Sequence, residues 1–183
     1  MKTKSILRIL AYVAVISSLA IASTGCKKEE PKVEKAAEQA APQAAQGPTT
    51  AANAALPEDG FKAEITVNNP PTTIKAKAEV TVEVKVKNTS NALWPAKGQV
   101  DGKFQTRLSY HWLDKNGNIV INDGTRADLP SDLAQGKDVT LSAKVTAPEK
   151  PGNYVLEFDM MQELVSWFGP KGSPTAKVNV TVN

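Results

Sequence analysis

The chain has 183 residues, 41% of them hydrophobic, and a formal net charge of +3. Three of its 22 basic residues, Lys2, Lys4 and Arg8, lie at the extreme N-terminus, and the other 19 balance the 19 acidic residues. Nucleic-acid-binding proteins usually carry a clustered surplus of basic charge, so we do not expect nucleic acid as a partner.

The first 25 residues have the order of a secretory signal. A basic head is followed by an apolar run over residues 9–22 and then by small residues up to Gly25. The run is shorter than the roughly 20 residues that cross a bilayer. We therefore predict a signal peptide over residues 1–25 rather than a transmembrane helix.

Cys26, the single cysteine, follows this signal directly. The segment from Ser23 to Cys26 resembles the lipobox of bacterial lipoproteins, with Ser23 at the position where that motif usually has Leu. The resemblance implies cleavage between Gly25 and Cys26 and attachment of fatty-acyl chains such as palmitate to Cys26. The chain would then be anchored to a membrane without spanning it. The alternative is an ordinary secreted protein with a free thiol.

An acylated Cys26 leaves no thiol for a disulfide or a cysteine metal site. The anchored domain would face the periplasm or the cell exterior. Lys27 stands where some lipoproteins carry an aspartate that retains them in the inner membrane, which favours the outer membrane.

Residues 26–59 differ in composition from the rest of the chain. They consist largely of Ala, Gln, Lys, Glu, Pro and Thr, with Val33 and Leu56 as the only larger apolar residues. Such a segment buries too little apolar surface to offset the entropy lost on ordering. We predict a flexible tether here, followed by one domain over residues 60–183.

Within residues 60–183 the apolar residues alternate with polar ones, which is typical of half-buried strands. The alternation predicts seven strands, around Ile65–Val67, Val80–Val86, Leu108–Trp112, Ile119–Ile121, Val139–Val145, Tyr154–Met160 and Val178–Val182. Asn116-Gly117 predicts a hairpin turn, and no helical period is present. The expected fold is all-β, an antiparallel sandwich of about seven strands.

Two local features resemble immunoglobulin-like domains. The segment Pro151–Leu156 resembles their tyrosine corner, with Tyr154 two positions before Leu156, which replaces the usual second cysteine. Trp112 lies on an earlier strand, where these domains keep a core tryptophan. The resemblance implies an immunoglobulin-like sandwich in which Tyr154 and Trp112 are structural and aliphatic packing replaces the disulfide.

A wider resemblance covers most of residues 80–182. Asn88–Ser90, Leu93–Pro95, Pro151–Tyr154 and Trp167–Gly169 are similar to segments of the four-tryptophan immunoglobulin-like domain of autophagy receptors. They are also similar to immunoglobulin-like modules of bacterial surface and polysaccharide-related proteins. This chain has three tryptophans rather than four. The resemblance implies a module that binds partners or spaces domains and is not an enzyme.

The sequence offers little for catalysis. His111 is the only histidine, and Ser109 and Asp114 are its nearest candidate partners. Residues two apart on a strand share a face without making the three-way contact that activates a serine. We expect His111 at the surface or hydrogen-bonded to a neighbouring strand, and we assign no catalytic residue.

We expect no metal and no cofactor. Asp123 with Asp128, or Asp159 with Glu163, does not match the spacing of a calcium loop. Arg126 is expected to form a structural ion pair with Asp128 or Asp159.

The aromatic residues Trp94, Trp167 and Phe168 are the candidate contacts for a ligand or partner. The competing interpretation is core packing, the usual role of large aromatic side chains. Trp167 and Phe168 are adjacent, so on a strand they point to opposite faces and only one of them can enter the main core.

These features predict a non-enzymatic lipoprotein whose domain binds or scaffolds a protein partner in the cell envelope. The alternative is a carbohydrate-binding module that recognises polysaccharide through exposed aromatics. A third interpretation is a hydrolase accessory or inhibitor that docks through its loops.

Overall fold

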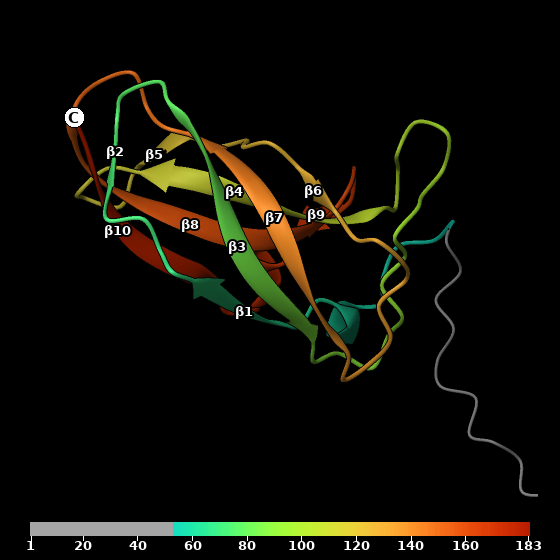
Figure 1. The fold of residues 1–183 in the computed structure, drawn as a ribbon. Helices are drawn as coiled ribbons and strands as arrows, with labels where there is room; N and C mark the ends of the chain where they lie inside the picture. The colour runs from blue at the N-terminus through green and yellow to red at the C-terminus, as the bar shows by residue number, and fades with distance from the viewer. Residues whose placement is uncertain (1–52) are drawn as a thin grey trace, which may run out of the picture. The chain divides into compact units, whose positions relative to one another are not determined.

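The computed structural model describes residues 53–183. The predicted signal peptide, Cys26 and all but the last residues of the predicted tether lie outside the described residues. The described part is all-β and consists of two sheets packed face to face (Figure 1). The smaller sheet, sheet A, contains β1 (Ala63–Asn68), β3 (Glu79–Asn88) and β7 (Asp138–Thr146), in that order across the sheet.

The larger sheet, sheet B, contains β2, β10, β8, β4 and β5 in that order. Their bounds are β2 (Thr73–Ile74), β4 (Thr106–Leu113), β5 (Ile119–Ile121), β8 (Gly152–Gln162) and β10 (Ala176–Val182). Two further short strands join this sheet: β6 (Ala127–Asp128) pairs with β4, and β9 (Ser166–Trp167) pairs with β8. All pairs are antiparallel except β2 with β10.

This topology is that of an immunoglobulin-like sandwich. β3 and β7 share one sheet while β4, β8 and β10 share the other, as strands B and E face C, F and G in such domains. The predicted fold class is therefore confirmed. The seven predicted strands correspond to β1, β3, β4, β5, β7, β8 and β10, and the two-residue strands β2, β6 and β9 were not predicted.

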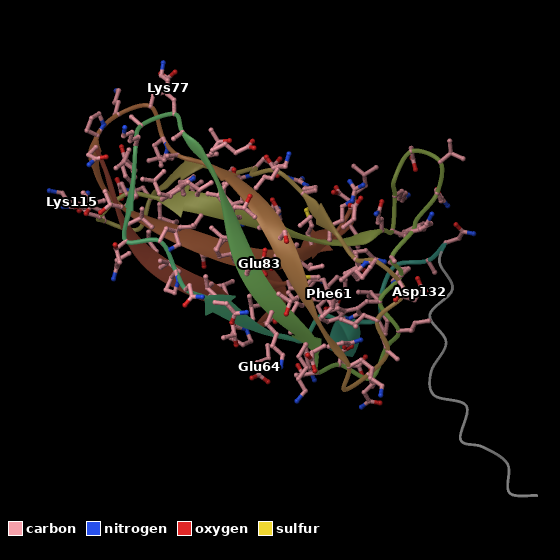
Figure 2. All side chains as sticks on the ribbon, in the orientation of Figure 1. Phe61, Glu64, Lys77, Glu83, Lys115 and Asp132 are labelled. Carbon is pink, nitrogen blue, oxygen red and sulfur yellow. The ribbon has the colours of Figure 1, made fainter. Side chains whose placement is uncertain are left out.

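The two ends of the sandwich differ (Figure 2). The hairpin end carries the turns over residues 114–118 and 147–151, together with Lys77 and Lys115. The N-terminal end carries residues 53–62, the loop over 98–105 and the turn over 163–166. Phe61 and Asp132 mark this second end in Figure 2.

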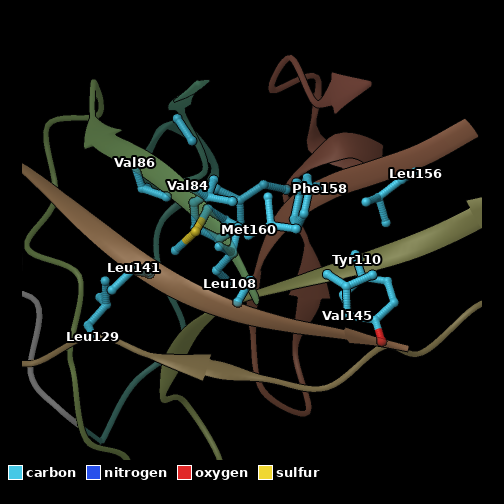
Figure 3. Close-up of a cluster of buried hydrophobic side chains, with 14 of the residues drawn as sticks. Val84, Val86, Leu108, Tyr110, Leu129, Leu141, Val145, Leu156, Phe158 and Met160 are labelled. Atoms are coloured by element: carbon cyan, nitrogen blue, oxygen red, sulfur yellow. The ribbon is translucent and has the colours of Figure 1, made fainter. Parts of the chain in front are cut away.

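The core lies between the sheets and follows from the alternation of the strands (Figure 3). β3 contributes Val82, Val84 and Val86, and β4 and β8 contribute the facing residues Leu108, Tyr110, Trp112, Leu156, Phe158 and Met160. Each large apolar side chain buried here stabilises the fold by about 1.5–3 kcal/mol.

Trp112 belongs to this core, and the partly buried Tyr154 packs against it. Trp112 is fully buried, lies opposite Leu156 in the β4–β8 register, and donates from Nε1 to the carbonyl of Thr146 at 2.9 Å. The Tyr154 hydroxyl donates to the carbonyl of Lys150 at 2.9 Å, the bond that defines a tyrosine corner. Leu156 is itself fully buried at the position of the absent cysteine.

The packed body begins before residue 60. Leu56 is buried in the core, and the 3-10 helix η1 (Glu58–Gly60) follows it. Gln162, fully buried, accepts the Leu56 N–H at 2.8 Å and donates to the carbonyl of Ala54 at 3.1 Å. The tether predicted over residues 26–59 is thus too long at its C-terminal end, because a single leucine in a polar segment shows no apolar period that would mark it as a core residue.

Candidate functional site

β5 forms an exposed edge of sheet B at the hairpin end. Its hydrogen-bonded neighbour among the described strands is β4, and its other side faces away from the sheet (Figure 1). Ile119 is 55% exposed and Val120 is 47% exposed. An edge strand with free backbone groups and exposed aliphatic side chains is a template for pairing with another chain.

The turn before β5 holds this edge in place. The Asp114 carboxylate accepts the backbone N–H groups of Asn116 at 2.8 Å and Asn118 at 2.9 Å. Gly117 takes φ of 84°, which a glycine adopts without strain. Hydrogen bonds from the side chain and backbone of Asn118 hold the pKa of Asp114 below its usual value. The Asp114 carboxylate therefore stabilises the turn of the predicted hairpin.

A hollow of about 320 Å³ adjoins β5. Its walls are Val120, Ile121, Pro148, Glu149, Lys150 and Tyr154. The hollow therefore combines three aliphatic residues and one tyrosine with one acidic and one basic residue. Glu149 is engaged by Lys77 at 2.8 Å in an exposed ion pair, and Lys150 offers its carbonyl to Tyr154. The arrangement can receive an apolar side chain from a strand added alongside β5.

Two of the three aromatic candidates lie in the core. Trp94 and Phe168 are fully buried, with their ring centroids 5.1 Å apart in an edge-to-face arrangement, and Phe61 packs on Phe168 at the same distance. Trp94 Nε1 donates to the carbonyl of Gly60 at 2.9 Å. These contacts correct the expectation that Trp94 or Phe168 meets a ligand. Phe61 contacts the Phe168 ring and Gly60 of η1 bonds to Trp94, and strand alternation does not reveal these long-range contacts.

Trp167 is half-buried on the outer face of sheet B. β9 turns back along β8, which places the Trp167 ring 4.2 Å from the ring of His111, centroid to centroid. The guanidinium of Arg126 lies 5.5 Å from the Trp167 centroid. Trp167 and Phe168 do point to opposite sides, as expected, but neighbouring side chains already contact the Trp167 ring.

His111 is only 8% exposed, so it is not a surface histidine. Its ring is covered by Trp167, and its Nδ1 contacts the carbonyl of Asn122, which follows β5. Of the two expectations for His111, the bond to a neighbouring segment is the one that the structure shows. The burial arises because β9 covers a face that the alternation of β4 alone would leave open.

The ion pairs of Arg126 differ from those expected. Arg126 pairs with Asp123 at 2.8 Å and with Glu163 at 3.0 Å, rather than with Asp128 or Asp159. Arg107 forms an ion pair with Asp128 at 2.7 Å and a second one at 3.3 Å with Glu163, the carboxylate that also pairs with Arg126. Glu163, at the start of the turn after β8, thus joins both arginines on the outer face of sheet B.

Asp159 is the one deeply buried carboxyl group of this face. It is 2% exposed, and its Oδ2 accepts the Gly169 N–H at 2.9 Å. Its Oδ1 has no hydrogen-bond partner among the described residues. Burial raises the pKa of Asp159 to about 7, and the charge of Glu157 adds to the rise.

The groups considered for catalysis or metal binding do not assemble. Ser109 Oγ donates to the carbonyl of Gly124 at 3.0 Å, and Asp114 is occupied by its own turn, so the pair does not form a triad with His111. Within residues 53–183 no three His, Cys, Asp or Glu side chains lie close enough to hold a metal ion. No helix in that range is long and apolar enough to cross a membrane.

Comparisons with known proteins describe the fold only. No family model matches the chain, and no curated protein matches it. The CARDB domain of the PF1109 protein from Pyrococcus furiosus, solved in complex with di-metal ions, is similar with a TM-score of 0.40 and 17% identity. The match covers 67% of this chain and 86% of that domain.

Two solved enzymes give similar values. A β-glucosidase from Listeria innocua, solved with laminaribiose, has a TM-score of 0.40 and 13% identity over 67% of this chain and 16% of the enzyme. AvmM, which catalyses macrocyclization in alchivemycin A biosynthesis, has a TM-score of 0.41 and 8% identity over 68% of this chain and 89% of AvmM. At such identities and scores, nothing about ligands or activity is transferred to this chain.

Proposed function

We propose that this protein is a membrane-anchored, extracytoplasmic lipoprotein whose immunoglobulin-like domain binds an extended segment of a protein partner along β5. The N-terminal signal and Cys26 support the anchor, as argued from the sequence. The single observation that carries the binding site is the exposed aliphatic edge of β5 beside its hollow.

The chemistry of β5 explains why an extended segment is the preferred partner. Natural edge strands are usually blunted by charged residues, proline or a covering loop. β5 is short, with three residues, and its pairing with β4 has a register shift between Trp112 and Leu113. Its side chains Ile119, Val120 and Ile121 are all uncharged aliphatics, and the first two are strongly exposed. An added strand would satisfy the free backbone groups and cover these side chains, so backbone bonding and apolar burial act together.

The geometry also predicts the pattern of apolar and polar residues in the partner segment. Side chains alternate along a strand, so every second residue of the added segment faces the hollow of Val120, Pro148 and Tyr154. Aliphatic residues at those positions fit its apolar walls. The other positions face solvent and accept polar residues.

The carbohydrate alternative receives no comparable support. A sugar platform needs an exposed aromatic face, but Trp94 and Phe168 are fully buried. Trp167 packs against His111 and Arg126. No other tryptophan stands at the surface of the described residues, since Trp112 is also buried.

The test uses site-specific photo-crosslinking in cells. A crosslinking amino acid at Val120 should give an adduct with a protein partner. Thr140 is the matched control, because it is also exposed on an edge strand, β7, but belongs to the other sheet. The same amino acid at Thr140 should give no adduct. The partner is then identified by mass spectrometry, purified and titrated against the wild type, Val120→Asp and Thr140→Asp.

Loss of affinity confined to Val120→Asp would support the proposal. Adducts of equal strength at both positions, or an adduct that contains only a second copy of this chain, would overturn it.

A further inference from the structure

Three of the five large apolar residues that are exposed among the described residues lie at the N-terminal end. They are Val100, Leu164 and Val165; the other two are Ile119 and Val120 of β5 at the hairpin end. Val100 is fully exposed and Leu164 is 68% exposed. Exposed aliphatic side chains gathered at one end of a domain mark an interaction surface.

The loop over residues 98–103 and the turn over residues 163–166, here called the two tips, are joined at their bases. The Phe104 N–H donates to the carbonyl of Glu163 at 3.0 Å, and the Glu163 N–H donates to the carbonyl of Gln105 at 2.8 Å. The first tip is closed by the Gly102 N–H, which donates to the carbonyl of Gln99. Figure 1 shows this loop projecting beyond the sheets.

The N-terminal chain leaves the domain next to these tips. Gln162, immediately before the second tip, donates from Nε2 to the carbonyl of Ala54 and, at 2.9 Å, to the carbonyl of Phe104 at the base of the first. Ala54, at the start of the described residues, is therefore held beside the bases of both tips.

The backbone of both tips is unusual. Leu164 in the second tip has φ of 57°, and Phe104, directly after the first tip, has φ of 71°; both lie in the left-handed region that non-glycine residues seldom adopt. Such strain persists only where the surroundings hold it, and it concentrates at functional positions. At Leu164 the strained backbone carries a side chain that is 68% exposed to solvent.

We propose that the two tips rest on the lipid surface to which the chain is anchored, with Val100 and Leu164 entering the headgroup region. This inference rests on the proposed lipid anchor. Lys97 is exposed directly before the first tip, and Lys103 lies at the end of the tip, where its carbonyl accepts the Gln99 N–H. Lysines beside an apolar tip favour anionic headgroups.

Because the chain between Cys26 and the domain is short, even weak contacts between the tips and the lipid are sufficient to orient the domain. Roughly 28 residues separate Cys26 from the packed body, and the flexible tether that their composition predicts would have a span of roughly 30 Å. Anchoring therefore keeps the tips at a high effective concentration near the lipid, so a few aliphatic side chains can bias how the domain faces the surface. The β5 edge, at the opposite end, would then point away from the membrane.

The test supplies the anchor chemically, so that it does not depend on acylation in the cell. The full chain without residues 1–25 is coupled through the Cys26 thiol to a maleimide lipid in phosphatidylethanolamine–phosphatidylglycerol vesicles that contain brominated acyl chains. Val100→Trp and Leu164→Trp report on the tips, and Val120→Trp at the hairpin end is the matched control. Brominated chains quench a tryptophan only when it enters the interface, to a depth of about 5–10 Å.

We expect quenching at positions 100 and 164 to exceed that at position 120 by about twofold or more, because only the tips reach that depth. The native Trp167, three residues after Leu164, should also be quenched in the otherwise wild-type chain, and a second variant with Val100→Asp and Leu164→Asp should abolish that quenching. Equal quenching at all three positions, or none at the tips, would overturn the proposal. Failure of acylation in cells would leave this result unchanged and would count against the proposed function alone.

Discussion

Asp159 shows how one side chain can couple this fold to pH. Burial raises the pKa of its carboxyl group to about 7, above the usual value near 3.8 of an exposed aspartate. The folded protein therefore binds more protons than the unfolded chain between about pH 4 and pH 7. The stabilisation of the folded state by protonated Asp159 is complete below about pH 4 and is lost as the pH rises through about 7.

We predict that Asp159→Asn removes this pH dependence. Asparagine can still accept the Gly169 N–H and stays neutral, so the wild type should lose up to about 4 kcal/mol more than the variant between pH 4 and pH 8. Urea unfolding at several pH values measures the difference. Parallel curves for the two proteins would show that Asp159 is not the titrating group.

Two tyrosine hydroxyls make a second comparison at the residue scale. Tyr110 is buried, and its hydroxyl accepts the Thr146 N–H at 3.0 Å. Tyr154 donates to Lys150 in an exposed setting, where water can replace the bond. Tyr110→Phe should therefore destabilise the domain by about 1–3 kcal/mol, and Tyr154→Phe by about 0.5–1.5 kcal/mol. Thermal unfolding of both variants tests the order, and a larger effect at Tyr154 would contradict it.

At the residue scale, sequence reasoning succeeded where one strand decides the outcome. Trp112 and Leu156 follow from the alternation of β4 and β8, and both are buried as expected. Trp94, Phe168 and His111 were harder to place because segments distant in sequence, η1 and β9, cover them.

The entry segment before β1 is the element whose role was least visible in the sequence. Leu56 is isolated among small and polar residues, yet it is buried, and its N–H is held by Gln162. Leu56→Ala should cost about 2–4 kcal/mol because it leaves a cavity in the core. Val100→Ala, at a fully exposed position, is the control and should leave the free energy of unfolding nearly unchanged. Equal melting temperatures for the two variants would argue that residues before 60 belong to the tether after all.

The strands themselves divide by length. Seven of them have three or more residues and were predicted from alternating apolar positions. β2, β6 and β9 have two residues each, too few to show any period. The omission matters most for β9, which carries Trp167 across the outer face of sheet B and creates the half-buried cluster there.

For the whole molecule, the two exposed apolar surfaces lie at opposite ends of the sandwich. β5 and its hollow occupy the hairpin end, while the two tips and the departing chain occupy the N-terminal end. This separation is compatible with the two proposals, an anchor at one end and a partner site at the other. The strands follow from local alternation, but the position of each exposed apolar surface depends on which loops lie together in space, and the sequence does not show this.

The anchor itself gives the last prediction. If Cys26 is acylated, Cys26→Ser should move the protein from the membrane fraction to the soluble extracytoplasmic fraction. The two tips expose only a few aliphatic side chains, and buried hydrocarbon stabilises membrane binding by about 0.8 kcal/mol per CH₂, so the tips alone cannot replace acyl chains. The matched control, Val100→Asp with Leu164→Asp in the acylated chain, should stay with the membrane. Mass spectrometry of the mature N-terminus provides the independent measurement. An unmodified Cys26, or a Cys26→Ser protein that remains with the membrane, would contradict the anchor.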